Sequence, residues 1–231
     1  QNFNRNYNGA VSAREALARS LNIPFVNLLS VRGVEPCLMQ LRQLGFQHMP
    51  RSAQHYGVSL VLGGAEANLW ELTAAYANLA NRAQQSFQQQ RSTWLQPTLL
   101  NNASPQTQRM ATLSTASAWL TLNALLEVAR PGDENYWEKF SSSRKVAWKT
   151  GTSYGQRDAW AIGTTPDYTV GVWVGNADGQ GRAGLTGTQS AAPILFNTFN
   201  LLPSTGKWFT RPAWQLTPVT LCQDDGYLSN G

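Results

Sequence analysis

The sequence has few of the residues from which many enzyme sites are built. Charged residues make up 13% of its 231 residues, and it contains only two cysteines and two histidines. Cys37 and Cys222 lie far apart, while His48 and His55 stand in a stretch that also carries proline and serine. The spacing of these two cysteines and two histidines does not fit a four-ligand zinc site. It also disfavours a serine or cysteine nucleophile activated by histidine, so we expect any catalytic base to be another residue type.

Long apolar runs and basic clusters are also missing. No window approaches the about 18 consecutive apolar residues of a membrane-spanning helix. The 18 Lys and Arg outnumber the 13 Asp and Glu, but no basic run is longer than Arg144-Lys145. A scattered excess of this kind gives a basic surface and disfavours nucleic acid as a partner. With 42% hydrophobic residues, the chain can build a sizeable core.

Helical signals fill roughly the first 130 residues. Ser12 and Glu15 form the pattern of a capping box, and Pro24 suits the first turn of a second helix after a break at 20–22. Gly45 would end a third helix, and Asn68 would cap a fourth. The expected helices cover 12–19, 24–29, 35–44, 69–80 and 110–128, with a glutamine-rich surface loop at 84–90.

The pattern then changes to short strands. Residues 145–153, 158–164 and 168–176 are rich in Val, Ile, Trp, Tyr and Thr and are joined by brief turns, which predicts an antiparallel meander. A helix over 189–201 should cover that sheet. We therefore expect an α+β domain over 1–202. The proline-bearing residues 203–231 are expected to form a linker and the start of a further domain.

One glycine motif suggests a dinucleotide site. Gly179-Gln180-Gly181-Arg182-Ala183-Gly184 matches the dinucleotide fingerprint, but antiparallel strands precede it and no acidic residue follows at the expected distance. A flexible glycine-rich connection is the better interpretation.

Two short motifs carry the candidate chemistry. Lys149-Thr150-Gly151-Thr152 lies in the first predicted strand, where alternation places Lys149 and Gly151 on one face and Thr150 on the other. A lysine, a hydroxyl and a glycine can anchor a carboxylate and let a substrate backbone approach. Ser20-Leu21-Asn22 lies in the break between two helices. Each motif alone is also explained as a strand end or a helix cap, but their combination occurs in penicillin-interacting serine enzymes.

The resemblance extends over most of the chain, from residue 7 to residue 200. The stretches that carry it are Gly9–Pro24, Leu62–Gly64, Ala74–Asn81, Lys149–Ser153, Arg157–Trp160, Val170–Asn176 and Ala191–Ile194. Together they resemble the C-terminal part of the transpeptidase domain of bifunctional, class A penicillin-binding proteins, and the proline-rich tail favours the 1C type. This resemblance implies a β-lactamase/transpeptidase-like α+β fold, with an antiparallel sheet flanked by helices and a mainly helical subdomain.

The sequence departs from the family at the nucleophile. Its only Ser-x-x-Lys is Ser142 to Lys145, which follows Ser20 instead of preceding it and leads directly into a strand. A catalytic role for Ser142 is therefore not expected. Because Gln1 is not a start methionine, we expect an internal piece of a longer protein, with the nucleophile upstream.

The resemblance implies acyl transfer through a serine ester on D-Ala-D-Ala stem peptides. Ser20 would relay a proton to the leaving amine, and Asn22 would bind the substrate amide or the upstream lysine. Lys149 would supply positive potential for the substrate carboxylate. Thr150 and Thr152 would hydrogen-bond that carboxylate. No metal or organic cofactor is called for.

The implied setting is the periplasmic side of the bacterial inner membrane, with an anchor upstream of this chain. The implied partners are peptidoglycan stem peptides, lipid-linked precursors, β-lactam antibiotics and the upstream part of the same protein, which would complete the fold. A serine β-lactamase or carboxypeptidase shares these motifs. A transpeptidase-like module that binds without turnover, and a purely structural scaffold, are further alternatives.

Aromatic residues and one carboxylate allow two interpretations. Trp148, Trp160 and Trp173 are expected in the sheet core. Trp70, Trp94 and Trp119 could be saccharide platforms, but packing is the simpler explanation. For Asp158, a buried or capping carboxylate is expected in preference to a catalytic one.

Overall fold

The computed structural model describes residues 9–87, 93–99, 107–109, 113–130, 144–222 and 228. The α-helices are α1 (Ala13–Ala18), α2 (Asn22–Arg32), α3 (Val34–Gln43), α4 (Ala53–Tyr56), α5 (Leu69–Ala83), α6 (Thr115–Leu125) and α7 (Ala192–Leu201). The strands are β1 (Thr93–Leu95), β2 (Thr107–Arg109), β3 (Ala147–Thr152), β4 (Asp158–Thr164) and β5 (Thr169–Gly175). Short 3₁₀ turns, η1 (Gly57–Leu62) and η5 (Ala213–Gln215), and a π-helical turn, η4 (Gly187–Ala191), complete the described elements.

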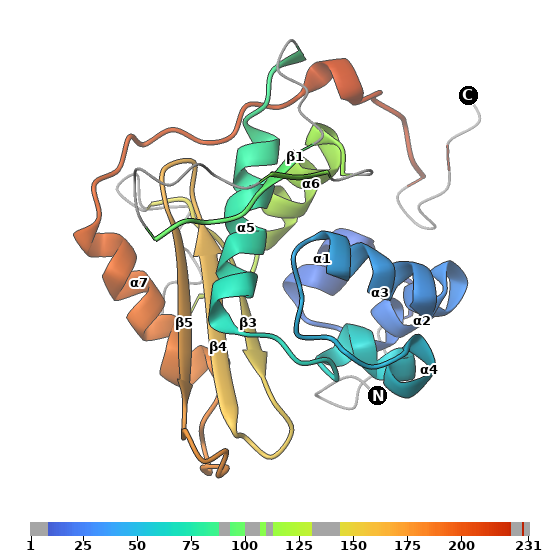
Figure 1. Cartoon of the computed structure of the whole chain (residues 1–231). Helices are drawn as coiled ribbons and strands as arrows, with labels where there is room; N and C mark the ends of the chain where they lie inside the picture. The colour runs from blue at the N-terminus through green and yellow to red at the C-terminus, as the bar shows by residue number, and fades with distance from the viewer. Residues whose placement is uncertain are drawn as a thin grey trace.

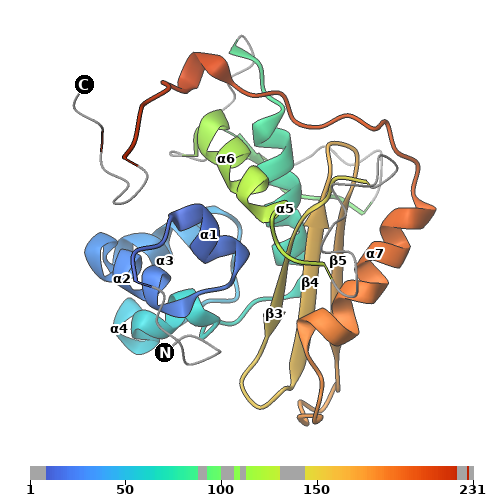
Figure 2. The same cartoon turned by 180° about the vertical axis from the view of Figure 1, so that it is seen from behind.

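Helices α1 to α4 and η1 form a lobe beside the sheet, which Figures 1 and 2 show from opposite sides. This lobe has its own apolar core, made by Leu29, Leu38, Phe46, Met49, Ala53, Tyr56, Leu60 and Ala75. Since Ala75 belongs to α5, that helix joins the lobe to the rest of the molecule.

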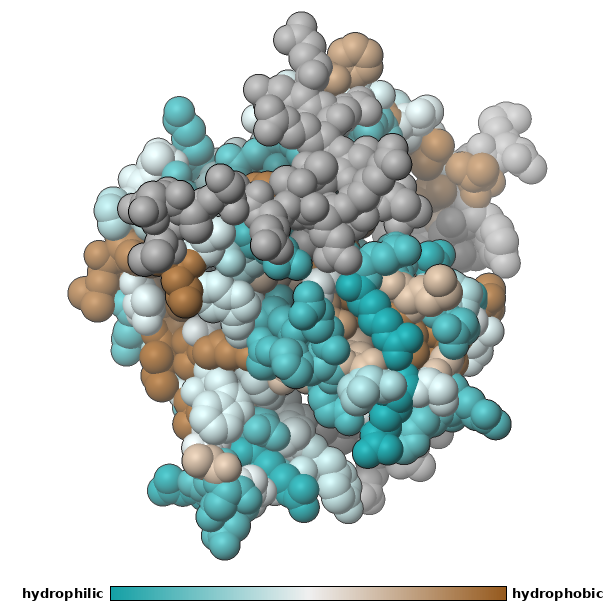
Figure 3. All heavy atoms as spheres, in the orientation of Figure 1, coloured by the Kyte–Doolittle hydropathy of each residue, from teal (hydrophilic) through white to brown (hydrophobic). Residues whose placement is uncertain are grey.

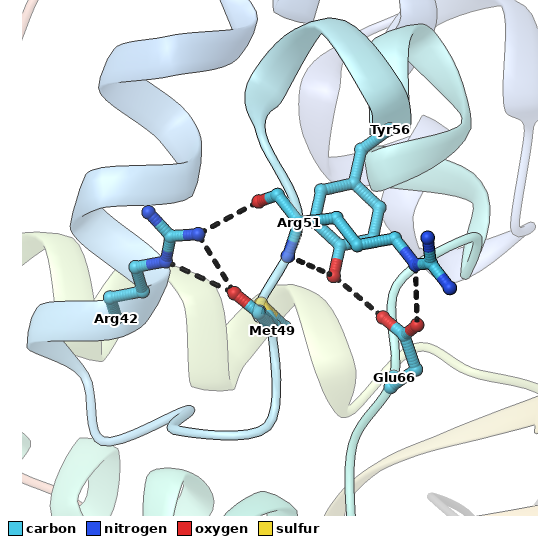
Figure 4. A network of polar contacts seen from close by, with 5 residues as sticks. All are labelled: Arg42, Met49, Arg51, Tyr56 and Glu66. Carbon is cyan, nitrogen blue, oxygen red and sulfur yellow. Dashed lines mark hydrogen bonds and ion pairs between the residues drawn. The ribbon is translucent and has the colours of Figure 1, made fainter.

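Polar contacts fix the connection between α3 and α4 within the lobe (Figure 4). The guanidinium of Arg42 donates to the backbone carbonyls of Met49 and Arg51, each at 2.8 Å. The hydroxyl of Tyr56 donates to Glu66 at 2.6 Å, and this hydrogen bond lowers the pKa of the Glu66 carboxyl. These bonds satisfy carbonyls that no helix or strand pairs, so the loop has a defined shape.

The larger core surrounds a three-stranded antiparallel sheet in the order β3-β4-β5. Helix α5 covers one face and α7 the other (Figures 1 and 2). A Cβ on Gly171 of β5 would meet Leu69 and Thr73 of α5, and one on Gly163 of β4 would meet Phe199 of α7 at 2.9 Å. Glycine at these two positions therefore lets the helices approach the sheet closely.

The turn between α1 and α2 has the hydrogen bonds of a Schellman motif. Leu21 N donates to Ala16 O at 2.9 Å, and Ser20 N donates to Leu17 O at 3.2 Å. Ser20 occupies the left-handed position of this motif with φ 56°, where glycine is usual. Leu21 and Ala16 are both buried beneath the turn.

The predicted meander is confirmed, and several helix boundaries need correction. Helix α2 runs over 22–32 instead of 24–29, and α6 covers 115–125 of the expected 110–128. The final helix begins as the π-helical turn η4, so its α-helical part starts at Ala192. The antiparallel pair of β1 and β2 was not expected, because each strand has only three residues and shows no alternation.

Residues after α7 pack on the domain, whereas their sequence shows no periodic pattern. Phe209 is buried, and its carbonyl accepts from the Trp119 indole at 3.1 Å. The side chain of Gln215 accepts from Ala116 N at the start of α6. Whether a further domain begins within 203–231 stays a prediction.

Candidate active site

Lys149 lies in the middle of β3, the sheet edge nearest the lobe in both views (Figures 1 and 2). Its side chain is half-buried, and this burial lowers the pKa of the ammonium. Its Nζ donates to Thr150 O at 3.0 Å, and no carboxylate pairs with it within the described ranges. An ammonium has three donors, so two remain for a ligand.

Thr150, Gly151 and Thr152 continue β3 with the alternation that the sequence predicts. Gly151 is paired with Trp160 across the strands, and its Cβ position lies 3.6 Å from the Trp160 side chain. On the opposite face, Thr150 lies next to Gly187 of η4. Lys149 and Thr150 therefore face different sides of the sheet, as expected for neighbours in a strand.

The start of η4 packs directly against β3, which we call the motif strand because it carries Lys149 to Thr152. Gly187 N donates to the Thr152 hydroxyl at 3.0 Å, which leaves that hydroxyl's own proton available to another acceptor. A Cβ on Gly187 would lie 2.6 Å from both Gly151 O and Trp160 O. Nothing in the sequence indicated this contact, because Gly187 and Gly151 are far apart along the chain.

The glycine-rich loop is attached to the β3–β4 hairpin by two hydrogen bonds, and its flexibility stays a prediction. Arg182 N donates to Gln156 O at 3.0 Å, and Gly184 N donates to the Gln156 side chain at 2.8 Å. Gln156 itself has φ 54°, an uncommon value for a residue other than glycine. This residue was also missed, because only its tertiary contacts distinguish it.

Ser20 and Asn22 lie at the α1–α2 turn of the lobe. Ser20 is exposed, and Asn22 is the first residue of α2. Helix α6 is the common neighbour, because both α1 and β3 pack against it. In the described structure no hydrogen bond joins Ser20 to Lys149 directly, so a link through a third group stays a prediction.

The remaining polar and aromatic candidates fall mostly into structural roles. Asp158 accepts from the Trp173 indole at 2.9 Å, in agreement with a structural carboxylate. Trp148 is fully buried, but Trp173 is 37% exposed, which corrects its expected place in the core. Its strand is at the sheet edge, where one side of the ring stays open to solvent.

The remaining expectations concern Ser142, a metal site and membrane-spanning helices. Ser142 lies outside the described residues. No cluster of three or more His, Cys, Asp or Glu side chains is arranged to hold a metal ion in the described ranges. The helices of the described part of the chain are all too short or too polar to cross a membrane.

The relatives described below are penicillin-binding proteins. No protein-family model matches the chain. Penicillin-binding protein 1C of Escherichia coli (strain K12) is 36% identical over 204 residues, which cover 88% of this chain and 24% of that protein. Penicillin-binding protein 1B of Vibrio cholerae is 29% identical over 84% of this chain and 24% of its own length. The chain thus spans about a quarter of the length of these curated relatives.

Solved structures agree on the fold. The crystal structure of penicillin-binding protein 1A from Haemophilus influenzae has a TM-score of 0.77 at 18% identity, covering 100% of this chain and 40% of that one. An imipenem acyl-enzyme complex of penicillin-binding protein A from M. tuberculosis has a TM-score of 0.64 at 21% identity, covering 87% and 50%. The predicted resemblance to class A penicillin-binding proteins and the transpeptidase-like α+β fold are confirmed.

Proposed function

We propose that this chain, a relative of the class A penicillin-binding proteins, supplies the carboxylate-binding and proton-relay part of a serine-type D-Ala-D-Ala transpeptidase. The observation that carries this proposal is Lys149, a half-buried cation on an edge strand with one backbone acceptor and no acidic partner within the described residues. A half-buried cation without a counter-ion is costly unless a ligand supplies the negative charge.

Lys149 and its neighbours suit the end of a peptide substrate. The Thr152 hydroxyl, whose oxygen already accepts from Gly187, and Thr150 would hydrogen-bond the terminal carboxylate of the stem peptide, while Lys149 would supply positive potential for it. Gly151 leaves the strand without a side chain where the peptide passes. The backbone N–H of Thr152 would contribute to an oxyanion hole, and such a donor is typically worth about 3 kcal/mol in the transition state.

Ser20 and Asn22 would complete the proton path from the other side. The attacking serine and its lysine are not in this chain, and we place them upstream. Ser20 would pass the proton from that lysine to the leaving D-Ala amine, while Asn22 would orient the substrate amide. The serine ester formed in this step is then cleaved by the amine of a second strand, which restores the serine and forms the cross-link.

The whole protein would work in peptidoglycan synthesis. It would join a glycosyltransferase that uses lipid-linked precursors to this transpeptidase, with β-lactams as inhibitors because they imitate the D-Ala-D-Ala amide. An upstream anchor would hold it at the periplasmic side of the bacterial inner membrane. The alternative is a catalytically inactive transpeptidase-like module that binds peptidoglycan or β-lactams.

Acylation by a fluorescent penicillin tests the role of Lys149 in the full-length protein. Lys149→Ala should lower the second-order acylation rate about 100-fold or more, because the β-lactam carboxylate loses its cation. Thermal stability should not fall, since a half-buried ammonium without a carboxylate partner does not stabilise the fold.

Lys145→Ala is the matched control, because Lys145 is exposed and lies just before the same strand. It should acylate at the rate of the unchanged protein. An unchanged acylation rate in Lys149→Ala would mean that Lys149 to Thr152 form an ordinary strand end without a role in catalysis. Penicillin that binds without forming an ester in the unchanged protein would favour the inactive module.

A further inference from the structure

Two cavities outside the candidate active site share a wall along α5. One has a volume of about 270 Å³ and extends to the β4–β5 turn, and the other, about 200 Å³, extends to the loop after α3. Trp70, Ala74 and Pro97 line both. Each alone is smaller than the roughly 300–1,000 Å³ of ordinary ligand pockets, and the two are neighbours through these shared side chains. We call them the α5 groove; α5 lies toward the viewer in Figure 1, and Figure 3 shows all atoms in the same orientation.

The side chains of the α5 groove combine an aromatic face with amide and hydroxyl groups and with the two carboxylates of Glu71 and Asp167. Trp70 is 50% exposed, although tryptophan usually contributes its area to a core. Amide and hydroxyl groups lie toward both ends of the groove, from Gln47, Asn81, Gln84, Gln96, Thr165 and Tyr168. Among the described residues that line it there is no lysine or arginine, which disfavours phosphates and other anions as ligands.

One end of the groove holds a polar cluster whose hydrogen bonds conflict. Asn68 Oδ1 accepts from Glu71 N at 2.8 Å, so the amide nitrogen of Asn68 is directed to His48 Nδ1, at 3.0 Å. The same Nδ1 lies 2.7 Å from Glu71 Oε1. A protonated Nδ1 satisfies the carboxylate and opposes the amide donor, whereas an unprotonated Nδ1 does the reverse.

A hydroxyl group would resolve this conflict. It can accept from the Asn68 amide and donate to Glu71 at the same time, which one imidazole nitrogen cannot do. The Glu71 side chain is only 9% exposed, and its Oε2 has no hydrogen-bond partner within the described residues. The His48 side chain is 65% exposed, so a ligand can displace it at little cost in packing.

We propose that the α5 groove binds an uncharged oligosaccharide, with a pyranose ring stacked on Trp70 and a sugar hydroxyl replacing the His48 imidazole between Asn68 and Glu71. A pyranose presents an apolar face of C–H groups beside a rim of hydroxyls, which matches an exposed indole flanked by amides and hydroxyls. None of the candidate active-site residues lines the groove, so this inference does not rest on the proposed transpeptidase function.

Two tetrasaccharides test the proposal on the full-length protein: the tetramer of N-acetylglucosamine and the tetramer of glucose. Hydroxyl-radical footprinting, read by mass spectrometry, locates the sugar without any mutation. Either tetramer should protect Trp70 from oxidation while leaving Trp214, which is 38% exposed outside the groove, unprotected, and the displaced His48 ring should not be protected. Protection by the first alone assigns N-acetylated sugars, and protection by both assigns pyranoses in general. Oxidation of Trp70 that neither tetramer changes overturns the proposal.

Variants then separate stacking from the hydrogen-bond exchange. Trp70→Ala should weaken binding, followed by saturation-transfer nuclear magnetic resonance, about tenfold or more, and Trp214→Ala should leave it unchanged. His48→Ala should bind as tightly as the unchanged protein or more tightly, because the ligand no longer displaces the ring. Equal affinity in Trp70→Ala, or lost binding in His48→Ala, overturns the proposed geometry.

Discussion

At the scale of single residues, the backbone conformation at position 20 favours glycine, whereas the proposed chemistry requires the hydroxyl of Ser20. The Schellman turn after α1 needs a left-handed residue, and glycine adopts that conformation without the clash that a Cβ causes. Serine at φ 56° costs stability that glycine would not. The exposed hydroxyl makes no hydrogen bond that stabilises the turn among the described contacts. A strained serine with a free hydroxyl supports a functional role, as proposed above.

Ser20→Gly should therefore make the protein more stable and less active. We expect the free energy of unfolding to rise by about 0.5–1 kcal/mol, because the strain of the left-handed Cβ is removed. Urea denaturation measures this gain, and the rate of penicillin acylation should fall in the same variant. Ser20→Ala keeps the Cβ, so it should lose activity without gaining stability. A stability gain with full activity in Ser20→Gly would show that the hydroxyl has no catalytic part.

At the scale of elements, the motif strand is held between its hairpin partner β4 and the turn η4. Gly187 touches the backbone of both strands, and Thr152 accepts its N–H. The loop before η4 is fastened to Gln156 in the hairpin that follows β3. These contacts place the hydroxyls of the motif relative to Lys149 before any ligand arrives.

Gly187→Ala should disturb this arrangement. The added methyl would lie 2.6 Å from two carbonyl oxygens of the sheet, so η4 must move away from β3. We expect a loss of about 2–4 kcal/mol in unfolding free energy, as in other overpacked sites, together with slower penicillin acylation. Chemical denaturation and acylation kinetics measure the two effects.

Gly184→Ala serves as the comparison for this substitution. Its Cβ would meet no atom within 4 Å, and only its φ of 82° opposes alanine, so we expect a cost of about 1 kcal/mol. Equal stability losses in the two variants would mean that the close approach of Gly187 has no special weight.

The same elements show what the sequence could and could not predict. The three strands and their antiparallel order follow from their β-branched and aromatic residues and brief turns, and the register confirms the alternating faces of Lys149 and Thr150. The turns at Ser12 and Asn68 follow from local capping, and both side chains do accept the expected backbone N–H. Local signals of this kind need no tertiary information.

Contacts between distant segments could not be predicted in this way. Gly187 and Gln156 matter because of partners far along the chain, and nothing in their immediate neighbourhood distinguishes them. Trp173 satisfies the strand pattern, but its exposure depends on what covers β5. Lys149 was identified from its motif. That no carboxylate among the described residues pairs with it could be seen only in the structure.

At the scale of the whole molecule, the chain carries the strand and turn of the proposed site, and no Ser-x-x-Lys precedes Ser20 in its sequence. One helical turn after Ser20 the residue is Ile23, not lysine. Lys145 has the right spacing from Ser142, but Ser142 lies outside the described residues and Lys145 lies two residues before β3.

The polypeptide from Gln1 to Gly231, expressed alone, should therefore form no covalent adduct with a fluorescent penicillin. Labelling should return when the upstream segment is supplied, either in the same chain or as a companion chain. Mass spectrometry of the treated fragment measures this, with the full-length protein as the positive control. A single acyl mass shift on Ser20 or Ser142 would contradict both the site assignment and the upstream nucleophile.

Helix α5 belongs to both hydrophobic cores. Ala75 packs into the core of the lobe, while Ala80 and Ala83, about two turns further on, pack into the core around the sheet. Because these side chains are so small, neither core can shift against the helix without opening a gap. Unfolding of one core would release helix α5, against which the other core packs. The two cores should therefore be one cooperative folding unit, and a ligand that holds α5 in place would raise the cost of unfolding both.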